Sequence, residues 1–284
     1  MILLNACQTE KSERNENTTS TDLNLYLGQK QPGLIPEIFV PNKNTSQDWK
    51  LGNPESLNLD EFYFTYTGNN PFEPLVVVYR NEGNSYKANK YKFNYNPSDS
   101  NTLYSRWNYI ERTNSGWSEM RSLGPMFERK EWGIMTLSIS NKGTIVIDDV
   151  KSNDVIRISE IKDGKREEPK LMSKEINTGK WTAHPFIAPN ESYLIWDSER
   201  EEGYGGADIY ISFRQEDGSW GKAINLGDKI NTKFWENAAK ITPDGKYLGF
   251  SRSEEKVRED GSTYWTSDKY WVSAEVIEKL RPKK

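Results

Sequence analysis

Between His184 and Gly227 the chain reads HPFIAPNESYLIWDSEREEGYGGADIYISFRQEDGSWGKAINLG, and this stretch has the pattern of four short strands. Apolar and polar residues alternate in them, and Gly, Pro, Asn and Asp separate them, which is typical of a half-buried antiparallel meander. One four-stranded sheet cannot bury its own faces, so the pattern also predicts neighbouring sheets of the same kind. The predicted strands are Pro185–Ala188, Tyr193–Trp196, Asp208–Phe213 and Lys222–Leu226.

The composition favours an all-β protein. The chain has 284 residues, of which 35% are hydrophobic and 12% aromatic, with ten Trp and fifteen Tyr. Aromatic residues are enriched in strands. The formal net charge of −4 disfavours a phosphate-binding surface, which needs clustered Lys and Arg. No run approaches the roughly 18 apolar residues of a membrane span. We therefore expect neither nucleic acid nor an integral membrane segment.

The N-terminal residues resemble a lipoprotein processing site. Leu4-Asn5-Ala6-Cys7 is similar to a lipobox, in which small residues precede a cysteine that is acylated. The segment Gln8–Asp22 is polar, as expected of a disordered tether. Six residues before Cys7 are too few for a signal peptide, so we expect a late or clipped start. The alternative is an ordinary free thiol near the terminus. We divide the chain into a tether, residues 1–25, and one domain, residues 26–284.

A strand–turn–strand pattern recurs along the chain. KITPDGKYLGFSR, around Pro243, matches FIAPNESYLIWDS, around Pro189, and weaker copies surround Asn141, Pro97 and Leu59. Their spacing of about 40–50 residues is in the range of propeller blades. A third strand is predicted after each copy: Leu75–Tyr79, Trp107–Glu111, Asp154–Ile158, Asp208–Phe213 and Lys269–Val272. The pattern thus predicts five blades of four antiparallel strands.

The fifth copy lacks a fourth strand. After Val272 the chain continues as SAEVIEKLRP, which predicts a short amphipathic helix ending before Pro282. The segment Pro36–Trp49 aligns with Glu168–Trp181 and Lys222–Trp235, both of which contain fourth strands. We expect this N-terminal segment to supply the outer strand of the last blade and to close the ring.

Four stretches of the chain resemble the PD40, or WD40-like, β-propeller repeats of the TolB-like superfamily. They are DIYISFRQEDGSWGKAINLGDKINT, ITPDGKYLGFS, KYWVSAEVIEKLRP and the opening YLGQKQPGLIPEIFVP. More narrowly, they resemble its bacterial exported lipoproteins. The resemblance covers roughly residues 26–282 and is strongest in the last two repeats. It implies a periplasmic or cell-surface binding scaffold, lipid-anchored at Cys7. Members of the superfamily are often six-bladed, so six blades are the alternative to five.

Recognition is expected on one face of the propeller. The turns between strands one and two, and between three and four, are short and share a face. The loops between strands two and three, and between blades, are longer and share the other face, called here the long-loop face. Four tryptophans that precede first strands are candidates to stack on a ligand there: Trp49, Trp132, Trp181 and Trp235. The alternative is that each indole packs between blades as a structural wedge.

Charged residues give further candidates at the channel mouth. Arg106, Arg200 and Arg252 follow second strands and could form a carboxylate or sulfate clamp, as in sialidases, or could close strand ends by local ion pairs. His184, the only histidine, begins a channel-lining strand and could be a general base or a structural residue. Glu236, with Asp197 or Asp208, could form a glycosidase pair.

Several kinds of site lack their sequence signature. The chain has no G-x-S-x-G, H-E-x-x-H, P-loop or dinucleotide-binding motif, and we expect no metal and no cofactor. The leading hypothesis is a monomeric envelope lipoprotein that binds a protein or glycan partner without catalysing a reaction. It would touch the membrane only through its lipid anchor. The alternatives are a glycoside hydrolase or sialidase-like enzyme, and a structural ring in a larger assembly.

Overall fold

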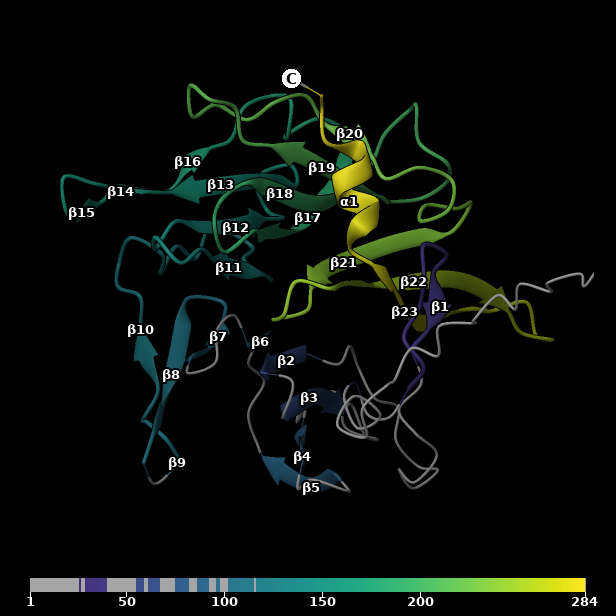
Figure 1. Ribbon diagram of the computed structural model, residues 1–284, viewed down its shortest axis with the longest axis horizontal. Coiled ribbons are helices and arrows are strands. Elements are labelled where there is room, and N and C mark those ends of the chain that lie inside the picture. Colours follow the sequence, from purple (N-terminus) through teal and green to yellow (C-terminus); the bar gives the residue numbers. More distant parts are fainter. Residues whose placement is uncertain are drawn as a thin grey trace, which may run out of the picture.

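A computed structural model describes Tyr26, residues 29–39, residues 102–114 and residues 116–283, and between residues 55 and 97 the backbone of strands alone. The described chain is all-β except for one short helix (Figure 1). It consists of successive antiparallel sheets, most of them four-stranded, in which neighbouring strands usually follow one another in the sequence. This arrangement resembles the blades of a propeller.

The first sheet contains β2 (Glu55–Asn58), β3 (Glu61–Tyr66), β4 (Leu75–Asn81) and β5 (Tyr86–Tyr91). The second contains β6 (Asn96–Pro97), β7 (Thr102–Ser105), β8 (Asn108–Thr113) and β10 (Arg121–Ser122), with β9 (Gly116–Trp117) also paired to β8. The third contains β11 (Leu137–Ile139), β12 (Ile145–Asp149), β13 (Val155–Ser159) and β16 (Lys170–Leu171), and β14 (Ile161–Lys162) and β15 (Lys165–Arg166) form a separate hairpin.

The fourth sheet contains β17 (Lys180–Ile187), β18 (Tyr193–Glu199), β19 (Asp208–Phe213) and β20 (Ile224–Asn225). The last contains β21 (Trp235–Ile241), β22 (Tyr247–Val257), β23 (Thr263–Ser273) and β1 (Glu37–Ile38). The N-terminal strand therefore lies at the edge of the C-terminal sheet.

The segment after Pro36 pairs with the last strand, as the sequence alignment predicts. Glu37 is opposite Trp271 and Ile38 is opposite Tyr270, in antiparallel register. Phe39 continues the contact by donating its backbone N–H to Lys269. The remainder of the predicted segment, residues 40–49, lies outside the described residues.

Aromatic packing fixes the N-terminal segment to the last sheet. The Tyr26 ring lies 5.0 Å from the ring of Tyr247 and 5.4 Å from that of Trp271. Its hydroxyl donates to Asp244, and the Tyr247 hydroxyl donates to Gln31. Tyr26 is fully buried, so this contact also contributes hydrophobic free energy.

Adjacent sheets pack face to face through branched aliphatic and aromatic side chains. One buried cluster joins Val146 and Ile156 of the third sheet to Trp196 of the fourth. A second joins Ile209 of the fourth sheet to Phe250 of the last. Burying one such side chain completely contributes about 1.5–3 kcal/mol to stability. The sheets therefore support one another, as the sequence pattern predicts.

The prediction of half-buried strands is wrong for β19, all six residues of which are buried. Sheets cover both of its faces, so its polar residues need partners inside the protein. Ser212 donates to the carbonyl of Gly221, and Asp208 accepts from the backbone N–H of Tyr204 and from Asn225. In β19 the alternation of apolar and polar residues therefore distinguishes two faces that are both buried, rather than a buried face from an exposed one.

The predicted helix is present as α1 (Glu275–Leu280). Its buried Ile277 joins the cluster between the fourth and last sheets. The helix ends before Pro282, and the guanidinium of Arg281 lies 4.5 Å from the centre of the Phe213 ring. α1 thus covers one end of the last two sheets (Figure 1). No described helix has the length and apolar composition to cross a bilayer.

Candidate functional site

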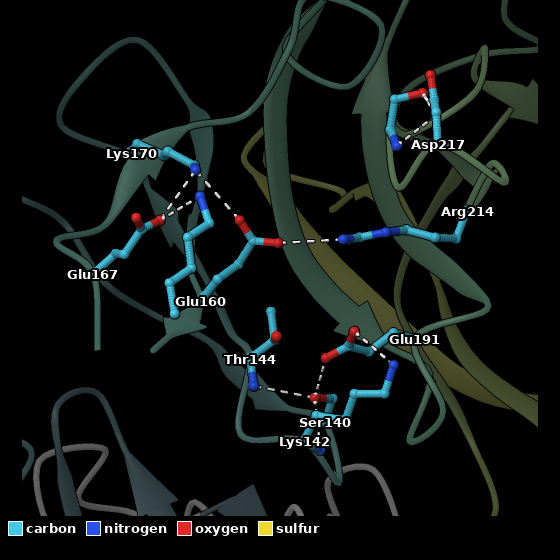
Figure 2. Close-up of polar contacts among 11 residues, drawn as sticks. Ser140, Lys142, Thr144, Glu160, Glu167, Lys170, Glu191, Arg214 and Asp217 are labelled. Atoms are coloured by element: carbon cyan, nitrogen blue, oxygen red, sulfur yellow. Dashed lines mark hydrogen bonds and ion pairs between the residues drawn. The ribbon is translucent and has the colours of Figure 1, made fainter. Parts of the chain in front are cut away.

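The short turns of the third and fourth sheets are joined by ion pairs (Figure 2). Glu191, in the β17–β18 turn, accepts from Ser140 at 2.7 Å and lies 3.5 Å from Lys142, both in the β11–β12 turn. Glu160, after β13, bridges Lys170 and Arg214, each at 3.3 Å. Glu191 and Glu160 therefore each join the third sheet to the fourth on this face.

The opposite ends of the sheets share a repeated geometry at their first strands. In each of the last three sheets, one residue lies three positions after the tryptophan that begins or precedes the first strand. These residues are Met135, His184 and Ala238. His184 and Ala238 have positive φ angles of 49° and 52°, and the register of β17 and β21 shifts next to them. Left-handed backbone at a non-glycine residue costs about 1–2 kcal/mol, so neighbouring groups must stabilise it.

Buried carboxylates on the second strands provide this stabilisation. Asp148, on β12, accepts from the backbone N–H of Met135 at 2.7 Å in its own sheet and from that of His184 at 3.2 Å in the next. Asp197, on β18, accepts from the backbone N–H of Ala238 at 2.9 Å in the last sheet. Each carboxylate thus joins its sheet to the first strand of the following one.

The imidazole of His184 completes this chain of contacts. Its Nδ1 atom lies 3.0 Å from Oδ1 of Asp197, and the side chain is partly exposed. Burial opposes protonation, but Asp197 and Asp148 outweigh it and raise the pKa of His184, with Lys240 acting in the opposite sense. Burial raises the pKa of Asp148, against its backbone hydrogen bonds and the nearby imidazole. The contacts run from Asp148 of the third sheet to His184 and Asp197 of the fourth, and Asp197 extends them to Ala238 of the last.

Three tryptophans form a row on the long-loop side, called here the tryptophan row: Trp181, Trp235 and Trp265. The ring centres of Trp181 and Trp235 are 6.3 Å apart, and those of Trp235 and Trp265 are 5.7 Å apart. Trp181 and Trp265 are each 54% exposed, whereas Trp235 is partly buried between them. The structure therefore brings two of the predicted tryptophans together and adds a third.

The central indole is held by the loop between β18 and β19. A Cβ atom at Gly206 would lie only 2.3 Å from Cδ1 of Trp235, so the indole packs directly on the glycine backbone. The backbone N–H of Gly206 also donates to the carbonyl of Phe234. Trp235 therefore fits both predicted roles: its indole packs against the Gly206 backbone like a structural wedge, and it also stands in the row beside two exposed indoles.

Trp132 lies apart from the row. Its indole is covered by the guanidinium groups of Arg157, 4.4 Å from the ring centre, and Arg129, at 5.6 Å. Arg157 is itself fixed by Asp149 at 2.9 Å. Trp132 thus packs against the core as part of a cation–π stack. The fourth predicted tryptophan, Trp49, and the predicted lipidation site, Cys7, lie outside the described residues.

Two of the three predicted arginines have local partners. Arg252 donates to Glu236 at 2.6 Å and to the carbonyl of Ile230, and its guanidinium lies 4.3 Å from the centre of the Tyr270 ring. Arg200 donates to the carbonyl of Ile176 at 3.0 Å.

Ile176 and Ile230 occupy equivalent Ile-Asn-Thr turns, so these two arginines have the same anchoring role in neighbouring sheets. Arg106 is an exposed residue with φ 55° in the turn between β7 and β8. Among the described contacts, the three guanidinium groups do not meet in a common clamp.

The carboxylates suggested for glycoside hydrolysis are buried. Asp197 is 2% exposed, and Asp208 and Glu236 are fully enclosed. Glu236 accepts from Arg252 and from the backbone N–H and hydroxyl of Thr232. A glycosidase acid and base must face the scissile bond. Within the described ranges, moreover, no three His, Cys, Asp or Glu side chains gather as metal ligands.

Trp265 is not among the predicted residues, because the sequence pattern predicts strands of ordinary length in the last sheet. β22 and β23 each have eleven residues, and their pairing continues to Val257 opposite Thr263. The pairing of β21 with β22 ends at Ser253, so the β22–β23 hairpin extends past β21. This extension carries Trp265 to within contact of Trp235. Residues 263–273 read TYWTSDKYWVS, in which apolar and polar residues do not alternate regularly, so periodicity gives no signal for the longer strand.

No protein-family model matches the chain, and no curated protein matches it. The structure is similar to those of β-propeller proteins. TolB from Acinetobacter baumannii is 9% identical, with a TM-score of 0.46, and the match covers 80% of this chain and 57% of TolB.

A gluconolactonase from Xanthomonas campestris is 10% identical, with a TM-score of 0.45 and coverage of 84% of this chain and 97% of that one. An α-L-arabinofuranosidase from Lactobacillus brevis is 12% identical, with a TM-score of 0.43 and coverage of 79% and 92%. The chain thus spans little more than half the length of TolB and nearly all of the two enzymes, and it is similar to all three in fold alone.

Proposed function

We propose that this protein is a non-catalytic binding scaffold, a closed five-bladed propeller that holds a protein or glycan partner on its long-loop face. The observation that carries the proposal is the tryptophan row, in which two indoles are each 54% exposed beside a third that is fixed. Exposed aromatic groups of this size are characteristic of binding surfaces. The carboxylates that could perform hydrolysis are instead buried and bonded.

Ring closure is supported by the pairing of β1 with β23 and by the packing of Tyr26 on Trp271. A five-bladed ring would place the first sheet beside the last, and a sixth blade is the alternative. Cross-linking distinguishes them: cysteines placed in the first and last sheets should join within one molecule if five blades close the ring. Failure of these cysteines to cross-link within one molecule would contradict the five-bladed arrangement.

The same proposal places the protein in the bacterial envelope as a monomer, anchored by a lipid at Cys7. The test expresses the full-length gene in a bacterium and labels the cells metabolically with palmitate. Label should enter the wild-type protein and be absent from Cys7→Ser. Equal labelling of both proteins, or none in either, would contradict the anchor while leaving the binding proposal intact.

Binding itself is tested by immobilising the protein and passing solubilised envelope proteins and glycans over it. Retention of a partner should fall at least tenfold in a Trp181→Ala/Trp265→Ala double variant. Trp220→Ala is the matched control, since Trp220 lies beneath Arg214 in the fourth sheet, away from the row. Equal retention by the wild type and the double variant would overturn the proposed site.

The alternative enzyme is tested with a panel of chromogenic glycosides and sialosides. If the wild type hydrolyses a member of the panel and a folded Glu236→Gln variant does not, the protein is a hydrolase and the scaffold proposal is wrong. Absence of turnover, together with partner binding that depends on the row, supports the scaffold.

A further inference from the structure

We propose that the tryptophan row binds a glycan chain of low net charge, with sugar rings stacked on Trp181 and Trp265. This inference rests on the proposed binding function and names the class of its ligand. Sugars present flat C–H faces, which pack on indoles, and a dense rim of hydroxyl groups, which needs hydrogen-bonding partners. The surface around the row provides both kinds of group.

The central indole of the row and the backbone of Trp181 are held by neighbouring segments. Trp235 is fixed between its neighbours by the Gly206 backbone, and it meets Trp265 edge to face, at an interplanar angle of 83°. Trp181 is positioned by its backbone N–H, which donates to Asp154. The indoles come from β17, β21 and β23, so two adjacent sheets define their spacing. A preformed aromatic surface reduces the entropy lost on binding.

Hydroxyl and carboxylate side chains lie on the same sheet face as the row. Ser253 is opposite both Trp235 and Ser267, and the two serine hydroxyls are 3.0 Å apart. Glu255, two residues further along β22, is opposite Trp265. Residues two apart on a strand share a face, so these polar groups alternate with the indoles.

This composition favours a glycan over a protein partner. The cores of protein–protein interfaces are enriched in aromatic residues, Met and Arg, and depleted in Lys, Glu and Ser. Here the indoles are interspersed with Ser253, Ser267 and Glu255, and Lys180 precedes Trp181 in the chain. Such a mixture suits a ligand that forms many hydrogen bonds between its apolar faces.

The charges near the row largely compensate one another. Lys180 lies 3.8 Å from Glu199, its partner in the register of β17 and β18. Near the hairpin, Lys256 forms an ion pair with Glu254. Glu255, opposite Trp265, and Asp154, bonded to the backbone of Trp181, add carboxylates, which disfavour an acidic glycan.

The test uses the intact chain and a panel of neutral hexasaccharides: β1,4-, β1,3- and α1,4-linked glucose, β1,4-linked N-acetylglucosamine, β1,4-linked xylose and β1,4-linked mannose. Calorimetry and tryptophan fluorescence measure binding. We expect at least one member to bind with a dissociation constant in the micromolar to low millimolar range, on the order of 1 mM or tighter. Trp181→Ala and Trp265→Ala should each weaken it about tenfold, Trp265→Phe should weaken it less, and Trp220→Ala should leave it unchanged.

Two results would overturn the inference: no member of the panel binds at about 5 mM, or binding is unchanged in the Trp181→Ala/Trp265→Ala double variant. The proposal of a binding scaffold is tested separately from the proposal of a glycan ligand. If the glycans fail but a protein partner is retained in a row-dependent manner, the ligand is a protein and the scaffold stands. If neither is retained, both proposals fail. Circular dichroism of each variant shows that it is folded.

Discussion

His184 and Asp197 form an ion pair across the fourth sheet, with Nδ1 of the imidazole 3.0 Å from Oδ1 of the carboxylate. The same Asp197 oxygen accepts from the backbone N–H of Ala238 in the last sheet, and the backbone N–H of His184 reaches Asp148 in the third. The only histidine of the chain therefore belongs to a series of contacts, from Asp148 to Ala238, that links three sheets.

This arrangement predicts pH-dependent stability. The carboxylates raise the pKa of His184 in the folded state above the ordinary value of 6.5. The stabilisation is fully present below pH 6.5 and is lost as the pH rises through the folded pKa. Thermal unfolding between pH 5.5 and 8.5 should show a falling melting temperature. His184→Gln should remove this part of the slope; an unchanged slope would contradict the ion pair.

Asp148 could add a slope of the same sign, since burial raises its pKa above 3.8. Comparing wild type with His184→Gln, Asp148→Asn and the double variant separates the two contributions, because each single variant removes one titrating group. A further check is the imidazole titration by NMR, which should shift to lower pH in Asp197→Asn.

A second prediction concerns the pair of Arg252 and Glu236. Glu236 is fully buried, so replacing Arg252 by Met leaves a carboxylate without its guanidinium partner. Removing one member of a buried ion pair costs about 3–5 kcal/mol of unfolding free energy. Chemical denaturation should show this loss. Adding Glu236→Gln to the Arg252→Met variant should recover part of it, because the unpaired charge is gone.

Lys256→Met is the control for that experiment. Lys256 pairs with Glu254 on the same strand, but both side chains are well exposed. Exposed pairs contribute about 0–1 kcal/mol. A similar loss of stability in the two variants would mean that strand β22, rather than the buried charge, is sensitive to substitution.

The third prediction concerns the short-turn side and Glu191 (Figure 2). Burial opposes ionisation of this carboxylate, but Thr144, Ser140 and Lys142 outweigh it and lower its pKa below 4.5. Its contribution to stability is present above pH 4.5 and is lost as the pH falls through the folded pKa. Glu191→Gln should lose about 1.5–3 kcal/mol at neutral pH. The difference from wild type should shrink on acidification; a difference independent of pH would exclude the charge as its cause.

Much of the secondary structure was predictable because it is encoded locally. The alternation and turn residues predict β19 with its observed bounds, and α1 follows from its amphipathic pattern. The first strand of the fourth sheet was placed too late, from Pro185 instead of Lys180. Irregular register and the left-handed residues Trp181 and His184 interrupt the two-residue period there. Periodicity cannot detect a strand that shifts its register.

The site was less predictable because it depends on contacts between sheets. The positions of the tryptophans identify Trp181 and Trp235, but Trp132 looks equivalent in sequence and is instead covered by Arg157. Trp265 enters the row only because the β22–β23 hairpin is long. The contact of Asp148 with His184 crosses between sheets, and no local pattern specifies such a distance.

The fourth prediction concerns the N-terminal anchor. Tyr26 is buried against Trp271 although it lies far from it in the sequence. Tyr26→Ala should lower the unfolding free energy by about 3–5 kcal/mol, as for other buried aromatic residues. Tyr26→Phe keeps the ring and loses only the bond to Asp244, about 1 kcal/mol. Ile35→Ala, at an exposed nearby position, should have no measurable effect. Full stability in Tyr26→Ala would show that the segment is dispensable.

The last prediction connects the β18–β19 loop to the tryptophan row. A methyl group at Gly206 would lie 2.3 Å from the Trp235 indole, a distance that real Cβ atoms do not reach, so Gly206→Ala must displace the ring. Trp235 contacts both Trp181 and Trp265, so its displacement should alter the coupled indole signal in near-ultraviolet circular dichroism. Gly33→Ala is the matched control, because nothing lies within 4 Å of its added methyl group. If Gly206→Ala leaves the spectrum and ligand binding unchanged, the central indole does not depend on that loop.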